Sequence, residues 1–166
     1  MSWISTIGYE GAAIDDFVET LLRAGVTALV DIREVAVSRR KGFSKRSLSQ
    51  AVEMAGVSYF HLRGLGDPKP GRDAARRGDF LEFQRIFRLH LESDVARQDL
   101  SAASSLARQH LICLMCYERD PQACHRKIVA EQLSANLCVK IRHLGVQRGI
   151  AGASFGDKEI ACARSC

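Results

Sequence analysis

The chain has 166 residues, of which 46% are hydrophobic and 26% charged, and this balance excludes a disordered chain and a collagen-like repeat. Its formal charge is +5, from 24 Lys and Arg residues against 19 Asp and Glu residues, which mildly favours phosphate-bearing partners. No apolar run approaches the roughly 20 residues that span a bilayer, so we expect a single globular domain and no membrane partner.

The N-terminal sequence and the cysteine content both favour the cytoplasm. Residues 1–10 have neither the basic start nor the long apolar segment of a secretory signal. Six cysteines are too few for a small disulfide scaffold of this length. We therefore expect reduced thiols in a cytoplasmic protein.

Short apolar strands alternate with amphipathic helices in the first part of the chain. Strands are predicted at three apolar runs, which cover residues 3–7, 26–32 and 57–62. Helical spacing of apolar residues predicts helices between them, over residues 14–24 and 44–56.

The alternation continues after a stretch rich in glycine and proline. Residues 63–78 are predicted to form a loop because they contain many turn-forming residues. The elements expected after this loop are a long helix over 79–96, a second helix over 100–108, a strand over 110–116, a helix over 120–135 and a fifth strand over 137–144.

This order of elements predicts an α/β fold. Apolar strands that alternate with helices form a parallel sheet whose faces the helices cover. We expect a single three-layer domain over residues 1–145, with a mostly parallel five-stranded sheet and helices on both faces. Residues 146–166 are rich in Gly, Ala and Ser and are expected to form a tail or an edge element.

The chemically versatile residues follow the carboxyl ends of the predicted strands. These ends meet at one edge of a parallel sheet, where open α/β folds bind their ligands. We therefore expect four loops to converge on one site. The candidate residues on them are Tyr9, Glu10, Asp31, Arg33, Ser38, Arg39, His61, Arg63, Cys116, Glu118, His125 and Arg126.

The loops after the second and third predicted strands are strongly basic. Guanidinium groups bind phosphate through two parallel hydrogen bonds, and the ring of Phe43 is placed to contact a base. The alternative is a solvated basic loop whose arginines pair with nearby carboxylates. The residues expected to bind substrate or phosphate are Tyr9, Glu10, Arg33, Ser38, Arg39, Arg63, His125 and Arg126.

Four residues are candidates for catalysis. Cys116 ends a buried strand shortly before a predicted helix N-terminus, a setting that lowers the pKa of a thiol, and it is expected to act as a nucleophile or to shape the site. Glu118 and His61 are expected to move protons, and Asp31 to provide a second carboxylate. A phosphatase loop is excluded, because Gln122 stands where such a loop needs arginine. In the alternative interpretation each of these side chains has a structural role.

Three cysteines and a histidine, in two closely spaced pairs, invite comparison with a zinc site. The spacing argues against it, because Cys113 and Cys116 would face opposite sides of a strand, and Cys124 and His125 would lie about 100° apart on a helix. A partial site of Cys116, Cys124 and an acidic residue stays open, but we predict no metal and no cofactor.

Four blocks of sequence resemble a widespread bacterial family, the domain of unknown function 488. The resemblance covers residues 4–144 and implies an α/β fold with a shared site, without implying a reaction. The blocks are Thr6–Gly11; Leu29–Arg33 with Ser38-Arg39 and Gly42–Ser44; His61-Leu62 with Leu65-Gly66; and Leu114–Glu118 with Cys124–Arg126.

These observations favour an enzyme, a hydrolase or a transferase, that acts on a nucleic acid or a nucleotide-like phosphorylated substrate. One alternative is a non-catalytic nucleic-acid-binding module, in which the basic loops follow a phosphate backbone. A second alternative is a thiol- or metal-dependent redox protein. The sequence sets no oligomeric state.

Overall fold

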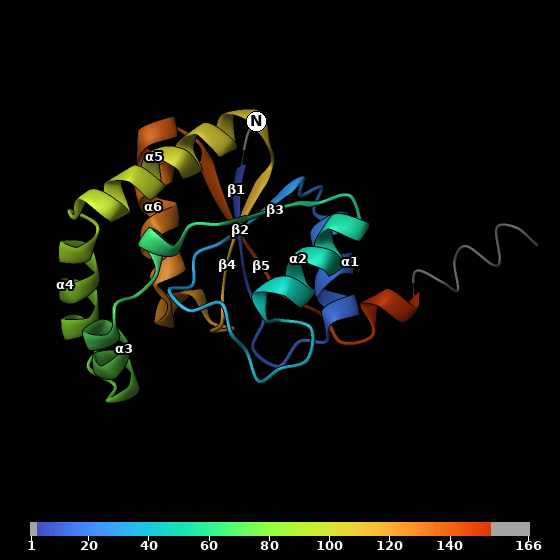
Figure 1. Cartoon of the computed structure of the whole chain (residues 1–166), viewed down its shortest axis with the longest axis horizontal. Helices are drawn as coiled ribbons and strands as arrows, with labels where there is room; N and C mark the ends of the chain where they lie inside the picture. The colour runs from blue at the N-terminus through green and yellow to red at the C-terminus, as the bar shows by residue number, and fades with distance from the viewer. Residues whose placement is uncertain (1–2, 154–166) are drawn as a thin grey trace, which may run out of the picture.

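The computed structural model describes residues 3–153 and contains a five-stranded sheet with helices packed against both faces (Figure 1). Every strand pairs in parallel with its neighbours, in the order β3-β2-β4-β1-β5. This confirms the predicted three-layer α/β fold, and the sheet is parallel throughout. The strands are β1 (Trp3–Gly8), β2 (Ala28–Asp31), β3 (Ser58–His61), β4 (Ile112–Cys116) and β5 (Lys140–Leu144).

Helices on both faces bury the central strands and so explain their continuous apolar runs. α1 (Ile14–Arg23) and α2 (Lys45–Met54) cover one face, where Phe17 and Leu48 pack with the odd-numbered residues of β4. On the other face Phe87 and Val129 pack with Leu114. The helices of that face are α4 (Phe80–His90), α5 (Asp94–Gln109) and α6 (His125–Leu137), with α3 (Lys69–Arg76) outside them (Figure 1).

The strand order places a crevice at the carboxyl edge of the sheet. The chain moves in one direction along the sheet from β1 through β2 to β3, and then reverses through β4 to β5. β2 and β4 are neighbours, so the connections that leave them diverge. Such a reversal is where open α/β folds bind their ligands.

Three predicted boundaries are wrong. Residues 63–78 are not a plain loop, because a 3₁₀ turn (η1, Arg63–Leu65) and helix α3 lie within them. Pro70 sits in the first turn of α3, where proline favours a helix because its missing N–H would have no helical partner there. The helix predicted over 79–96 ends at His90, because Ser93 caps a new helix by accepting a hydrogen bond from Ala96 N at 3.3 Å. The helix predicted from 120 begins only at His125, after a 3₁₀ turn (η2, Pro121–Ala123).

The segment after β5 contacts α1 where the structure describes it. The backbone N–H groups of Ala151 and Gly149 donate to the Asp16 carboxylate at 3.0 and 2.9 Å, and these bonds lower the pKa of Asp16. The rest of the predicted tail or edge element lies outside the described residues. Within residues 3–153 no helix has both the length and the apolar character that crossing a bilayer requires.

Candidate functional site

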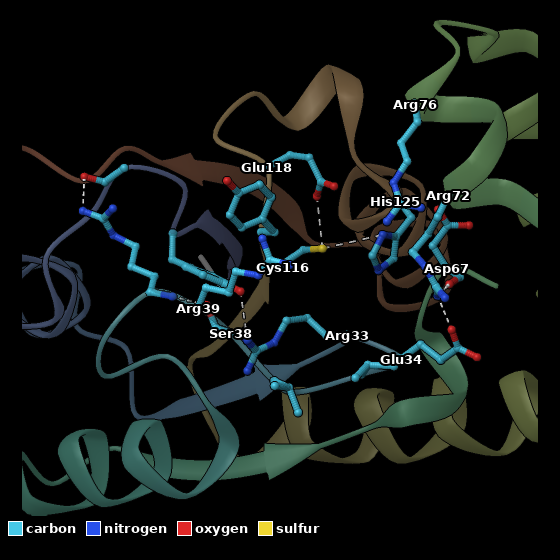
Figure 2. Close-up of a pocket in the computed structure, with 16 residues that line it drawn as sticks. Arg33, Glu34, Ser38, Arg39, Asp67, Arg72, Arg76, Cys116, Glu118 and His125 are labelled. Atoms are coloured by element: carbon cyan, nitrogen blue, oxygen red, sulfur yellow. Dashed lines mark hydrogen bonds and ion pairs between the residues drawn. The ribbon is translucent and has the colours of Figure 1, made fainter. Parts of the chain in front are cut away.

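A cavity of about 840 Å³ opens at the carboxyl edge, between the loops that follow β2 and β4 (Figure 2). Its volume is typical of small-molecule sites. The walls come from the loops after β1, β2 and β4, from α3 and from the start of α6. The predicted site residues that line it are Tyr9, Arg33, Ser38, Arg39, Cys116, Glu118 and His125.

A buried ion pair forms the base of this site. Arg33 donates from Nε and Nη2 to the Asp31 carboxylate at 2.9 and 2.6 Å, and from Nη1 to Tyr9 Oη and Phe43 O at 3.0 and 2.8 Å. Tyr59 Oη also donates to Asp31 at 2.6 Å, and burial together with the Asp31 charge raises the pKa of Tyr59. Asp31 is fully buried and does not line the cavity. Its position therefore corrects the expected catalytic role, because the carboxylate anchors Arg33 instead.

Two further predicted residues brace the loop after β4. Arg126 is 1% exposed and donates to the carbonyls of Glu118 and, at 3.0 Å, Arg119, while Glu10 Oε2 accepts a hydrogen bond from Arg119 N at 2.9 Å. Neither side chain lines the cavity, so the expected contact of Glu10 and Arg126 with phosphate is not supported. The loop crosses β1 so closely that a Cβ on Gly8 would lie 1.8 Å from Glu118 O, which explains the glycine.

Three other expectations are corrected by side-chain placement. His61 Nε2 donates to Arg33 O at 2.8 Å, so this ring supports the backbone and does not reach the cavity. Arg63 lines a separate pocket beside α5. The ring of Phe43 is fully buried and stacks on Tyr9 at 4.4 Å. Tyr117, which is 46% exposed and lines the cavity, presents the aromatic surface that we expected from Phe43.

The Cys116 thiol, the His125 imidazole and the Glu118 carboxylate line the cavity together (Figure 2), and the Cys124 thiol lies within 4.8 Å of the first two groups. Cys116 Sγ lies 3.2 Å from Glu118 Oε2 and 3.7 Å from His125 Nδ1. Cys124 Sγ lies 4.0 Å from the same nitrogen. The predicted separation of Cys124 from His125 is wrong, because Cys124 has extended backbone angles (φ −135°, ψ 141°) and precedes the helix. Both side chains therefore reach the same point.

The electrostatics of this cluster favour ionised Glu118 and protonated His125. Burial raises the pKa of Glu118, but hydrogen bonds from Cys124 and the backbone and the His125 charge outweigh it, so the net shift is downward. Burial lowers the pKa of His125, but Cys124, the Ile32 carbonyl and Glu118 raise it to about 9. A hydrogen bond with Cys124 lowers the pKa of Cys116, but burial and the Glu118 charge outweigh this effect, so the net shift is upward. The expected activated thiolate at Cys116 is thus not favoured.

The wall formed by α3 and the turn before it holds residues that were not among the predicted site residues. Asp67, Arg72 and Arg76 line the cavity opposite Arg39 (Figure 2). Arg72 pairs with Glu34 and also donates to Asp67 O. Pro70 was the sequence signal for this helix, because proline favours the first helical turn.

Asp67 is a buried carboxyl without full hydrogen-bond compensation. Its Oδ1 finds no hydrogen-bond partner within the described residues. Burial raises the pKa of Asp67 to about 6, although the charges of His125 and Arg72 oppose the shift. An ionisable carboxyl of this kind, in a cavity, is typical of functional sites.

The raised pKa of Asp67 makes protein stability depend on pH between about 4 and 6. The folded state binds this proton more tightly than the unfolded chain does, so the stabilisation is complete below about pH 4 and lost as pH rises through 6. Asp67→Asn should therefore raise the free energy of unfolding by about 2–3 kcal/mol at pH 8 and flatten its pH dependence.

Thermal unfolding from pH 4 to 8 checks this expectation. Asp73→Asn is the matched control, because Asp73 lies on α3 in a partly exposed pair with Arg76. An Asp67→Asn variant less stable than the wild-type chain at pH 8 would contradict it.

Comparison with known proteins identifies a family and nothing more specific. The family model described as domain of unknown function DUF488 matches residues 13–133, which is most of the chain. The match confirms the resemblance and includes both loops, after β2 and β4, between which the cavity lies. No curated protein and no solved structure matches the chain.

Proposed function

We propose that this chain, which belongs to the DUF488 family, is an enzyme that binds a nucleotide-like phosphorylated substrate in the cavity and acts on it by acid–base chemistry. The observation that carries the proposal is the position of Arg39 and Arg76 on opposite sides of a cavity that Glu118 and Asp67 also line (Figure 2). Cations at the opening attract and hold the phosphate, and the carboxyl groups provide the chemistry.

Carboxylates neutralise the charge of only some of the arginines that line the cavity. Arg33 and Arg72 form ion pairs with Asp31 and Glu34, so these two guanidinium groups add little net charge. The remaining lining arginines are Arg39, Arg40 and Arg76.

Nearby carboxylates offset little of the positive charge of these three arginines. Arg39 is exposed and forms no hydrogen bond or ion pair with the residues that the structure describes. The Arg40 guanidinium donates only to backbone carbonyls, and Arg76 pairs with Asp73 through a largely exposed contact of 3.2 Å. A concave surface with excess cationic charge concentrates anions, so the cavity favours a phosphorylated ligand.

The apolar part of the lining of the same cavity suits the base of a nucleotide. Val35, Val37 and Tyr117 line it and are all exposed, although large apolar side chains are usually buried. Every nucleobase has a flat π-face that stacks on an aromatic ring or packs against apolar side chains. A nucleotide can therefore place its base against these side chains and its phosphate near Arg39.

Two carboxyl groups with opposite pKa shifts supply the acid and the base. The pKa of Glu118 is lowered, so this group is a carboxylate at neutral pH, whereas the pKa of Asp67 is raised to about 6. Pairs of carboxyl groups whose surroundings displace their pKa values in opposite directions divide these roles in enzymes. Asp67 donates a proton to the leaving group, and Glu118 accepts one from the attacking nucleophile, as a hydrolase or a transferase requires.

Arg39→Ala and Arg76→Ala should each weaken the binding of a nucleoside monophosphate by roughly 10-fold to 100-fold, because each hydrogen bond to a charged group contributes about 1.5–3 kcal/mol. Both variants should also reduce the dependence of affinity on salt. Calorimetric titration with a panel of nucleoside monophosphates and short oligonucleotides measures both effects. Arg88→Ala on α4 is the control, because Arg88 is exposed and does not line the cavity.

Absence of binding by every member of the panel would refute the proposal, as would equal loss of affinity in the Arg88→Ala control. Turnover is assayed by product analysis on the ligands that bind. Salt-sensitive oligonucleotide binding without any product would identify a non-catalytic nucleic-acid-binding module instead.

The proposal assigns the enzyme to the cytoplasm. The described cysteines are all free, and three of them, Cys113, Cys116 and Cys124, are buried. Reduced thiols are the ordinary state in that compartment.

A further inference from the structure

We propose that Cys116, Cys124 and His125 form a binding site for a thiophilic divalent metal ion, with zinc as the best match, at the floor of the cavity. The two Sγ atoms and His125 Nδ1 all lie within 4.8 Å of one another. All three residues are buried, so the ligand atoms converge in a space that the fold defines. This inference concerns metal binding and does not depend on the nucleotide proposal.

The distances are close to those of a tetrahedral metal site. Zinc binds sulfur at about 2.3 Å and nitrogen at about 2.0–2.1 Å, which separates neighbouring ligand atoms by roughly 3.5 Å. His125 Nδ1 lies 3.7 Å from Cys116 Sγ and 4.0 Å from Cys124 Sγ. Small side-chain adjustments therefore complete the coordination.

The imidazole is already oriented for coordination through Nδ1. Its Nε2–H donates to the carbonyl of Ile32 at 3.0 Å, so Nδ1 is the ring nitrogen that faces the two sulfurs, and it coordinates a metal ion once it has released its proton. The ring also packs against Phe87, with the ring centroids 5.1 Å apart. A backbone carbonyl that accepts the second ring N–H is the usual outer partner of a metal-binding histidine.

The fold brings the ligands together from two short segments. Cys116 ends β4, Cys124 is the extended residue before α6, and His125 is the first residue of that helix. Two thiolates and an imidazole select zinc, cobalt and similar ions over magnesium and calcium, which prefer oxygen. Among the described cysteines, Cys113 packs on the opposite face of the sheet and Cys138 is exposed at the end of α6, so neither belongs to the site.

A fourth ligand can reach the metal ion from the cavity. Cys116, His125 and Glu118 all line it, and Glu118 Oε2 lies 3.2 Å from Cys116 Sγ. Two cysteines and one histidine with an open fourth position are a ligand set of catalytic zinc sites. A metal there can bind water or a phosphate oxygen beside Glu118, and this last assignment, unlike metal binding itself, rests on the proposed function.

Metal binding is tested on the purified full-length chain. After incubation with Zn²⁺ and removal of the excess, elemental analysis should find one zinc ion per chain. Cobalt substitution should produce thiolate-to-metal absorption and the d–d bands of a tetrahedral site. In the wild-type chain, zinc should slow the alkylation of Cys116 and Cys124 and leave that of Cys138 unchanged, as peptide mass spectrometry can show.

Three variants locate the site. Cys116→Ser, Cys124→Ser and His125→Gln should each lose stoichiometric zinc, whereas the control Cys138→Ser should retain it; circular dichroism establishes that each variant is folded. The site is refuted if the wild-type chain retains no zinc, if folded Cys124→Ser and His125→Gln variants keep one ion, or if zinc fails to protect Cys116 and Cys124. Zinc binding without any nucleotide binding would refute only the proposed function, and nucleotide binding without zinc would refute only the metal site.

Discussion

Asp31→Ala should lower the free energy of unfolding by about 3–5 kcal/mol, because removing one partner of a buried ion pair leaves the other charge buried and uncompensated. Asp31 is fully buried and accepts hydrogen bonds from Arg33 and Tyr59. Arg33 in turn holds Tyr9 and the Phe43 carbonyl, so the loops after β1 and β2 both depend on this carboxylate. Equilibrium denaturation in urea measures the loss.

The matched control is Arg85→Ala, which removes an exposed ion pair with Glu82 on α4. Exposed pairs contribute little, so its unfolding midpoint should stay close to the wild-type value. Equal stability of Asp31→Ala and the wild-type chain would show that the Asp31–Arg33 pair does not organise the base of the cavity.

Arg126→Met should lower the free energy of unfolding by about 2–4 kcal/mol, because it preserves side-chain volume while leaving two carbonyls without their donor. Arg126 is 1% exposed and donates to the carbonyls of Glu118 and Arg119. The loop that positions Glu118 should loosen, so catalytic turnover should fall even though the guanidinium does not line the cavity. Denaturation measures the first effect, and a turnover assay on a ligand that binds in the titration measures the second.

Two comparisons separate this bracing role from phosphate binding. Lys127→Ala removes the neighbouring surface pair with Glu131 and should leave stability nearly unchanged. Arg39→Ala should weaken ligand affinity without lowering stability. An Arg126→Met variant of wild-type stability that has lost only ligand affinity would mean that Arg126 contacts the ligand.

The fold was predictable from sequence because its strands are buried on both faces. β2 and β4 read as continuous apolar runs, and the intervening helices show regular apolar spacing. Parallel pairing then brings the carboxyl ends of the strands together, so Tyr9, Arg39 and Glu118 were correctly expected at one edge.

The direction of each side chain was not predictable in the same way. His61 and Arg126 lie near the cavity, but both side chains bond to backbone carbonyls instead of lining it. Such contacts depend on where loops from distant parts of the chain cross, as the approach of Glu118 O to Gly8 shows. Sequence position alone does not contain this information.

Two features of the cavity were not predicted: the wall that contains Asp67, and the approach of the Cys124 side chain to His125. In both cases the secondary structure expected for the segment was wrong. Glycine and proline in residues 63–78 indicated a loop, whereas Pro70 lies in the first turn of α3, a helix whose residue Arg76 lines the cavity. Cys124 was assigned to a helix, although the helix begins one residue later. One extended residue was enough to turn two separated side chains into neighbours.

The most direct test of the proposed function is a crystal structure of the full chain with a nucleoside monophosphate that binds in the titration. We expect the phosphate between Arg39 and Arg76, with the base against Tyr117 and the reacting group within reach of Glu118 and Asp67. A nucleotide bound elsewhere, for example only on the exposed basic side chains Lys41, Lys45 and Arg46, with the cavity free of ligand, would contradict it.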